Sequence, residues 1–300
     1  MTTATPRVDP ARFHPRTFSV RSPRRVQEFR FAYPVLSRRS KGISIGINPN
    51  PDKVCNFDCV YCQVDRKTPA TVTKVDMPTL EHELRTLLTM AQSRELKSVP
   101  PFDQVRDELF VLRDIALSGD AEPTTSRYFL EIVKAAVRIK REVGLPNLKI
   151  VIITNATGLN RPTVKEALLW LDQHNGEIWA KLDAGTEAYY KQIDKSRVPF
   201  QRVLENIQRV ANDRPIVIQS MFVRHGGVGP SQQEIEAYCG RLNHILRNGG
   251  RIKLVQVYTL ARPPADPTVT GLSHPEVDAI ASAVREKTGL ATESYYETLS

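Results

Sequence analysis

Six short apolar segments alternate along this chain of 300 residues with longer segments of helical periodicity. The apolar segments are rich in β-branched residues and stand at 43–47, 115–117, 148–153, 178–182, 216–223 and 252–258. Helices are expected between them at 79–94, 125–142, 162–174, 200–212 and 232–248, and another at 274–288. Continuously apolar strands that are each followed by a helix indicate βαβ units, and therefore a parallel sheet buried on both faces.

Right-handed crossovers wind such a sheet into a barrel or an open twisted layer. Six strands are two fewer than the eight that close a barrel. We therefore predict an α/β fold, a partial (βα)6 TIM-like barrel with a basic N-terminal extension, and keep a flavodoxin-like open sheet as the alternative. The predicted division is an extension at 1–41, the barrel at 42–260, and a C-terminal helix and tail at 261–300.

Composition narrows the class of protein. Hydrophobic residues make up 41% of the chain and charged residues 25%, and no charge-free apolar run approaches the 18 residues of a membrane span. The first residues carry many arginines and no signal-peptide core. Three of the four cysteines are clustered, which is unlike a disulfide framework. These features predict a cytoplasmic protein with no membrane partner.

The positive charge is concentrated at one end of the chain. Of the net charge of +9, residues 1–41 contribute +8, from nine arginines and one lysine against Asp9 and Glu28. Such an arm suits RNA, DNA or an acidic redox protein, and the alternative is a solvated extension. Aromatic residues that could stack on bases are interleaved with the arginines: Phe13, Phe18, Phe29, Phe31 and Tyr33. One functional alternative is therefore a non-catalytic nucleic-acid-binding protein stabilised by a metal or a cluster.

The segment "KVCNFDCVYCQVDR" places Cys55, Cys59 and Cys62 within eight residues. Structural zinc needs four ligands, and the nearest further donors, His82 and Cys239, are distant in the sequence. A catalytic thiol would need one activated cysteine rather than three. A [4Fe-4S] cluster takes thiolate ligands and normally has four, so three would leave one iron open to a small molecule with an amino and a carboxylate group. The cluster is the best fit.

Polar residues follow the predicted strands, and in parallel α/β folds the chemistry collects at the carboxyl ends of the strands. Residues in these positions include Gly119, Glu122, Asn155, Lys181, Asp183, Ser220 and Gln256. Lys181 and Asp183 are two residues apart, so their side chains share one face of a strand. We expect these residues to form one site together with the cysteine segment.

The spacing Cys-x3-Cys-x2-Cys, with Tyr61 before the last cysteine, resembles the signature of the radical S-adenosylmethionine (SAM) superfamily. The stretch "YPVLSRRSKGISIGINPNPDKVCNFDCVYCQVDRK" resembles a largely uncharacterised branch of Fe-S oxidoreductases related to the tRNA wybutosine-synthesis enzymes. The resemblance continues in order through "LSGDAEPTTS", "IITNATGL", "KLDAGT" and "VQVYTLARPP", so it covers about 33–264.

The resemblance implies a radical SAM Fe-S oxidoreductase in which Cys55, Cys59 and Cys62 hold a [4Fe-4S] cluster and SAM chelates its fourth iron. Reductive cleavage of SAM would give a 5′-deoxyadenosyl radical that abstracts hydrogen from an unidentified substrate, with a tRNA base as the first guess. A flavodoxin or ferredoxin would supply the electron. Cys239 alone cannot hold a second all-cysteine cluster, which separates this chain from the wybutosine type.

The same resemblance implies several SAM contacts and no catalytic side chain. Gly119 and Glu122 would receive the amino group, Lys181 the carboxylate and Asp183 the ribose, while Tyr61 would pack beside the adenine. Tentative contacts are Asn155, Ser220 and Gln256. Structural alternatives remain open for these residues: Glu122 as a helix cap, Lys181 and Asp183 as an internal salt bridge, Tyr61 as a core aromatic, and the others as partners of loop backbone.

Overall fold

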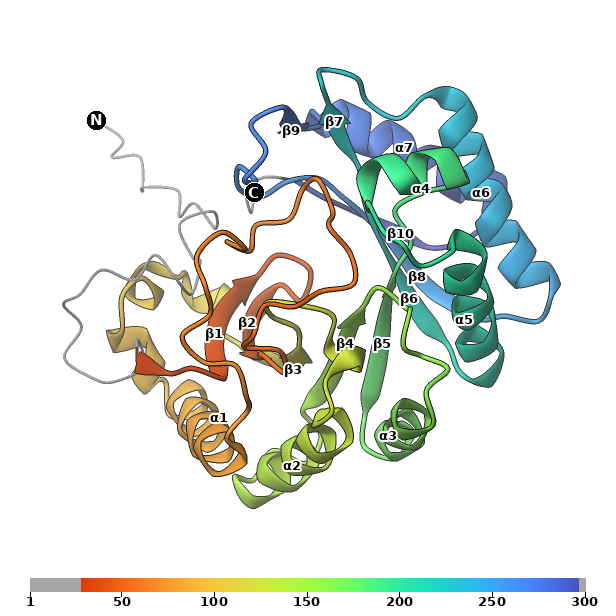
Figure 1. The fold of residues 1–300 in the computed structure, drawn as a ribbon. Helices are drawn as coiled ribbons and strands as arrows, with labels where there is room; N and C mark the ends of the chain where they lie inside the picture. The colour runs from red at the N-terminus through yellow and green to blue at the C-terminus, as the bar shows by residue number, and fades with distance from the viewer. Residues whose placement is uncertain (1–27, 297–300) are drawn as a thin grey trace, which may run out of the picture.

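The computed structural model describes residues 28–296 and contains a curled sheet with helices on its outer face (Figure 1). The six predicted strands form in the expected places, and each pairs in parallel with its neighbours. They are β2 (Gly42–Ile47), β3 (Leu112–Leu117), β4 (Lys149–Thr154), β5 (Gly176–Lys181), β6 (Ile216–Met221) and β8 (Ile252–Tyr258). The prediction of a partial TIM-like barrel is confirmed.

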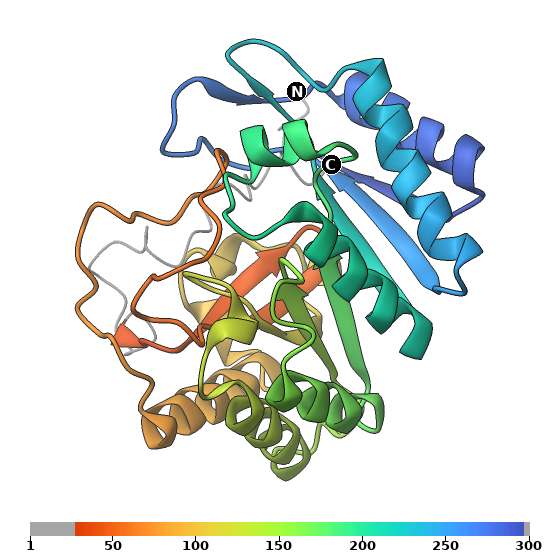
Figure 2. The same cartoon turned by 45° about the vertical axis from the view of Figure 1, so that its right-hand side comes forward.

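The helices cover the convex face of the sheet (Figures 1 and 2). Asp76 and Ser231 cap the helices α1 and α6 by accepting hydrogen bonds from backbone N–H groups in their first turns, as the side chains of good N-caps do. A short helix that the sequence did not predict, α4 (Glu187–Ile193), follows β5. The other helices are α1 (Met77–Gln92), α2 (Phe129–Glu142), α3 (Pro162–Asp172), α5 (Phe200–Asp213), α6 (Gln232–Arg247) and α7 (His274–Thr288). Short 3₁₀ turns are η3 (Glu95–Ser98), η4 (Phe102–Gln104), η5 (Asp107–Leu109) and η6 (Pro123–Thr125).

Two further strands lengthen the sheet to eight, in the order β1-β2-β3-β4-β5-β6-β8-β10. β1 (Ala32–Ser37) is antiparallel to β2, and β10 (Thr292–Tyr295) is parallel to β8. They come from the ranges assigned to the N-terminal extension and the C-terminal tail. The Glu83 carboxylate of α1 accepts hydrogen bonds from three consecutive backbone N–H groups, at 30–32, and so ties the start of β1 to the helix layer.

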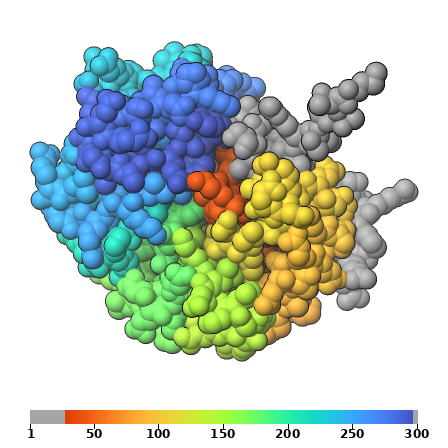
Figure 3. Space-filling model, turned by 180° about the vertical axis from the view of Figure 1, so that it is seen from behind, coloured from red at the N-terminus to blue at the C-terminus, as the bar shows by residue number. Residues whose placement is uncertain are grey.

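The edges of the open sheet meet through the turn at 38–41 between β1 and β2. Lys41 Nζ is 3.4 Å from Glu293 Oε1 of β10, and the Tyr295 hydroxyl donates to the Arg39 carbonyl at 3.4 Å. Arg38 donates to the Tyr296 carbonyl. From behind, the first described residues lie between the C-terminal elements and the segment after α1 (Figure 3). The interior of the partial barrel is therefore walled on its open side.

The sequence placed Phe31 and Tyr33 among the aromatic residues free to stack on bases, and the structure corrects this. Phe31 is 1% exposed and packs in the main core. The Tyr33 hydroxyl donates to the Ser118 carbonyl at 3.2 Å. Both side chains are already used by the fold, while Phe13 and Phe18 lie outside the described residues.

A small two-stranded sheet of β7 (Val223–His225) and β9 (Val269–Gly271) stands apart from the barrel. The sequence joined β6 and β7 into one strand, but the chain leaves the main sheet after Met221. Within residues 28–296, no helix is both long enough and apolar enough to cross a membrane.

Candidate active site

The three clustered cysteines lie on the loop between β2 and α1, which passes over the carboxyl ends of the strands (Figures 1 and 2). The end of α4 holds this loop by backbone contacts. Val60 N donates to the Ile193 carbonyl at 2.9 Å, and Asp58 N donates to the Asp194 carbonyl at 3.2 Å. Within the loop, Cys62 N donates to the Cys59 carbonyl at 2.9 Å and closes a local turn. α4, which the sequence missed, is thus the support of the cysteine loop.

Cys55, Cys59 and Cys62 are free thiols and partly buried, whereas Cys239 is buried in α6. Within residues 28–296, no three Cys, His, Asp or Glu side chains converge as they would around one metal ion. Zinc requires that convergence, with cysteine sulfurs about 2.3 Å from the ion. A cube binds each thiolate to a different iron, so it needs the sulfurs farther apart. Three thiols on one loop are the kind of ligand that an iron–sulfur cluster takes.

The electrostatic surroundings of the thiols disfavour a free thiolate. Burial raises the pKa of Cys55, and burial reinforced by the Asp194 carboxylate raises the pKa of Cys59 well above its ordinary value. Without a metal these groups carry their protons at neutral pH, which is the opposite of an activated cysteine nucleophile. Metal binding would displace the protons.

Lys181 and Asp183 form the internal salt bridge that the sequence left as an alternative, with Lys181 Nζ 3.2 Å from Asp183 Oδ2. Tyr61 joins this pair: its hydroxyl donates to Asp183, and Lys181 Nζ lies 4.9 Å from its ring centroid. Burial by itself would lower the pKa of Lys181, but the Asp183 carboxylate, together with Tyr258 and Cys59, outweighs it and the net pKa is raised. Lys181 therefore remains a cation beside the cysteine loop.

Asp194 completes this network and was not predicted from the sequence. Its Oδ1 is 3.3 Å from the Tyr61 hydroxyl and accepts from Cys59 Sγ at 3.6 Å. Burial, reinforced by the Asp183 carboxylate, raises the pKa of Asp194 well above its ordinary value. No motif in the sequence marks Asp194, and the helix before it was not predicted. Only the fold identifies this residue.

Glu122 follows β3 and is buried under strong hydrogen bonds. Its Oε1 accepts from the Thr124 and Thr154 hydroxyls at 2.6 Å each, and its Oε2 accepts from Asn155 N at 2.6 Å. It also caps η6 by accepting from Thr124 N at 3.1 Å. The capping alternative is thus realised, and the same carboxylate links the ends of β3 and β4.

Removal of this carboxylate should be costly. Glu122→Ala leaves two buried backbone N–H groups and two hydroxyls without their acceptor, and an unsatisfied buried group costs about 1–3 kcal/mol. We expect the free energy of unfolding to fall by about 3 kcal/mol or more in urea denaturation. Glu131→Ala, on the exposed face of α2, is the control and should change it by less than about 0.5 kcal/mol. Equal losses in the two variants would contradict the structural role.

Asn155 connects this strand end to the cysteine loop. Its Nδ2 donates to Asn56 Oδ1 at 2.8 Å, and its Oδ1 accepts from Thr157 N at 3.1 Å. Asn56 Nδ2 donates in turn to the Thr157 hydroxyl at 2.7 Å. Asn56, between the first two cysteines, is a second residue that sequence reasoning missed.

The remaining predicted residues, Gly119, Gln256 and Ser220, lie in different surroundings. A Cβ added to Gly119 would lie 2.4 Å from Asn48 Oδ1, so this position admits only glycine next to β2. Gln256 Oε1 accepts from Gln219 Nε2 at 2.7 Å inside the barrel. The Ser220 hydroxyl donates to the Leu182 carbonyl at 2.6 Å and shares a hydrogen bond of 2.5 Å with the Tyr238 hydroxyl of α6. Ser220 therefore faces the helix layer.

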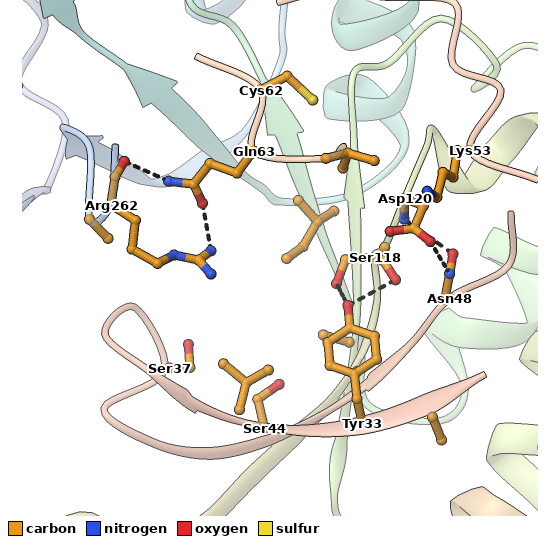
Figure 4. Close-up of a pocket in the computed structure, with 18 of the residues that line it drawn as sticks. Tyr33, Ser37, Ser44, Asn48, Lys53, Cys62, Gln63, Ser118, Asp120 and Arg262 are labelled. Carbon is orange, nitrogen blue, oxygen red and sulfur yellow. Dashed lines mark hydrogen bonds between the residues drawn. The ribbon is translucent and has the colours of Figure 1, made fainter. Parts of the chain in front are cut away.

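A cavity of about 970 Å³ lies between the barrel interior and the cysteine loop (Figure 4). Of the predicted site residues, Tyr61, Cys62, Gly119 and Lys181 line it. The others stand behind this wall: Cys55, Cys59, Glu122, Asn155, Asp183, Ser220 and Gln256. One side is closed by a reciprocal pair that the sequence did not indicate, in which Gln63 Nε2 donates to the Arg262 carbonyl at 2.8 Å and Arg262 Nη2 donates to Gln63 Oε1 at 2.5 Å.

Comparisons with curated proteins identify distant relatives. The "UPF0026 protein" of Helicobacter pylori strain 26695 is 24% identical over 234 residues, which are 77% of this chain and 66% of that protein. "UPF0026 protein MJ1312" of Methanocaldococcus jannaschii is 29% identical over 183 residues, 58% of this chain and 47% of that protein. The chain thus spans just under two thirds of the length of the H. pylori relative.

Two solved structures are similar. "Structure of TYW1 with a lysine-pyruvate adduct bound" matches with a TM-score of 0.49 and 13% identity, over 82% of this chain and 74% of that one. "Crystal structure of archaeal TYW1" matches with a TM-score of 0.44 and 13% identity, over 83% and 73%. The model of the Radical SAM superfamily matches residues 50–236, which include the cysteine loop and the strand ends from β3 to β6. This chain, more than half of which matches that family model, belongs to the radical SAM superfamily.

Proposed function

We propose that this protein is an enzyme that binds a [4Fe-4S] cluster through Cys55, Cys59 and Cys62 and reductively cleaves SAM. The observation that carries the proposal is a single clamped loop with three free thiols, of which Cys62 lines a cavity large enough for a cofactor. Cluster and SAM together would supply a 5′-deoxyadenosyl radical, which abstracts hydrogen from a substrate. The protein's part is to bind, orient and exclude water.

The side chains nearest the loop suit the cofactor's groups. The cationic Lys181 faces the cavity and would pair with the SAM carboxylate, and Tyr61 would lie beside the adenine. Asp183, held by Tyr61 and Lys181, would accept from the ribose hydroxyls. Gly119 leaves room for close approach of the amino group.

Glu122, Asn155 and Gln256 are kept in the proposed set as residues that shape the cavity wall from behind, since their polar atoms are bound within the protein. Glu122 would receive the amino group only after exchanging one of its present donors. Ser220 faces α6, and we leave it out of the proposed SAM contacts.

Anaerobic reconstitution with iron and sulfide tests the function directly. We expect a brown protein with about the four irons of one cube, and release of 5′-deoxyadenosine and methionine after reduction with dithionite in the presence of SAM. A correctly loaded cluster that leaves SAM intact would contradict the proposal. A colourless protein that carries zinc would favour the nucleic-acid-binding alternative.

The proposed reaction needs a reductant and a substrate. A low-potential flavodoxin or ferredoxin in the cytoplasm would supply the electron. RNA would bind through the arginine-rich N-terminus, whose residues 1–27 lie outside the described part. A tRNA base is the proposed substrate.

Arg66 should tune the cluster. Its Nη2 lies 3.6 Å from Cys62 Sγ, and a cationic donor at a sulfur favours the more negative, reduced cluster. Arg66→Gln should lower the midpoint potential by roughly 40 mV, the equivalent of about 1 kcal/mol for one hydrogen bond in a one-electron couple. Potentiometric titration followed by electron paramagnetic resonance measures it. Lys67→Gln removes the same charge from the exposed part of the loop, and an equal shift there would refute the specific contact.

A further inference from the structure

The cavity contains an arginine that the proposed function does not use. Arg39, on the turn at 38–41, lines the cavity, and its guanidinium carbon lies 5.1 Å from the ring centroid of Tyr258 and 5.8 Å from that of Trp179. The side chain makes no hydrogen bond, and no ion pair within 4 Å, with any residue of the described part of the chain. A guanidinium has five N–H donors, and here the protein supplies aromatic faces and no acceptor.

Arg262 is a second incompletely satisfied cation in the wall. Gln63 forms hydrogen bonds with the Nη2 group and the backbone carbonyl of Arg262. The Nη1 group of Arg262 is buried and has no acceptor among residues 28–296. Figure 4 shows this pair beside the cavity. A buried donor without a partner costs about 1–3 kcal/mol, and more when it is charged. An acceptor brought by a ligand would recover that cost.

Acidic residues of the cavity wall offset the charges of these two arginines only in part. The basic residues that line the cavity are Arg30, Arg38, Arg39, Lys53, Lys181 and Arg262, and they outnumber the acidic ones. Lys181 already has Asp183 as its partner. Asp114 interacts electrostatically with Arg39, but its carboxylate accepts from the Ser44 hydroxyl and is not within ion-pair distance. The interior therefore favours an anion.

The position of Arg39 separates it from the proposed SAM contacts. Trp179 precedes Lys181 by two residues on the same face of β5, so it lies about 6.6 Å deeper in the barrel. The Arg39 guanidinium lies near the rings of Trp179 and Tyr258, whereas Lys181 Nζ lies near those of Tyr61 and Tyr258. Tyr258 is therefore the neighbour that the two cations share, and Trp179 is near Arg39 alone. A cavity of about 970 Å³ is at the upper end of the usual range for one ligand, about 300–1,000 Å³, which leaves space beside SAM.

We propose that the cavity binds an anionic group of the substrate, a carboxylate or a phosphate, through Arg39, with Arg262 as a second cation of the same cavity wall. That this anion belongs to the substrate rests on the proposed radical SAM function. That the subsite binds an anion rests only on the two arginines and the cavity.

Trp179 provides a built-in reporter, because the chain has only two tryptophans. Trp170 lies on α3, is 38% exposed and can be replaced in a Trp170→Phe background. We would titrate the full-length, metal-free protein with sodium phosphate and, separately, with sodium acetate, at ionic strength held constant with chloride. Binding at Arg39 should change Trp179 fluorescence saturably, and the more effective anion identifies the group.

Arg39→Met should weaken the apparent affinity at least tenfold, Arg39→Lys less, and Arg262→Met severalfold. Arg127→Met is the matched control, since Arg127 also stacks on an aromatic ring, that of Tyr128, but on the exposed surface. No saturable response to either anion, or an equal response in Arg39→Met, would overturn the subsite. Displacement of both anions by SAM would also overturn the subsite, because Arg39 would then bind the cofactor and not the substrate. None of these measurements requires SAM cleavage, so failure of the proposed function is detected separately.

Discussion

Replacement of Cys55, Cys59 or Cys62 by alanine should abolish cluster assembly and, with it, formation of 5′-deoxyadenosine. Each thiol would bind a different iron, and the fourth cysteine, Cys239, is buried in α6 and stands outside this loop. Two remaining ligands cannot anchor a cube firmly, so iron and sulfide should fall to background after desalting. Absorbance near 400 nm, iron content and product formation should disappear together.

Cys239→Ala is the matched control because it removes the same side chain from α6, far from the loop in the sequence. It should keep full iron content and activity, and lose only about 1–2 kcal/mol of stability for the buried sulfur. A single loop variant that retains a full cluster would show that another residue supplies a ligand. Loss of the cluster in Cys239→Ala would show the same.

Gly185→Ala should produce the largest loss of stability for one added methyl group. Its Cβ would lie 2.1 Å from Tyr238 N and 2.5 Å from the carbonyl carbon of Ala237, both backbone atoms of α6. Backbone atoms within a helix cannot move aside as a flexible side chain can, so we expect a cost at the upper end of the usual range for overpacking, about 3 kcal/mol. Urea denaturation should measure this decrease in the free energy of unfolding.

The same substitution should impair the site, because Gly185 stands two residues after Asp183. Glu234, in the first turn of α6, holds this loop by accepting from Gly185 N and from the Thr186 hydroxyl at 2.6 Å. The control is Gly240→Ala in the same helix, where an added Cβ meets nothing within 4 Å. That change should stabilise the protein by about 0.5–1 kcal/mol. Similar effects of the two substitutions would contradict the close approach of the loop to α6.

Much of the barrel could be predicted from the chain alone. The apolar runs at 148–153 and 252–258 are long enough and sufficiently β-branched to be recognised as buried strands. β1 and β10 were not recognised, because β1 contains Pro34 and β10 reads TESY, three polar residues in a row before a tyrosine. Their strand conformation depends on an edge with which to pair, and local sequence does not show that edge.

The site also contains residues that the sequence could group and residues that only the fold brings together. Three cysteines in one segment, and Lys181 with Asp183 on one strand, are neighbours by covalent spacing, so the sequence was enough to group them. Asp194 belongs to the site because the end of α4 lies against the cysteine loop, which the sequence did not show. Ser220 points away from the site, because alternate residues of β6 face opposite sides of the sheet.

The sequence by itself determined the order of strands and helices and the family signature in the cysteine segment, since both depend on spacings of a few residues. Only the tertiary structure decided that the turn carrying Arg39 reaches β10 and faces Trp179, and that Gln63 meets Arg262 across 199 positions of the chain. Contacts over such separations arise from the winding of the whole sheet, because the curvature of the strands, rather than any local pattern, brings its two edges together.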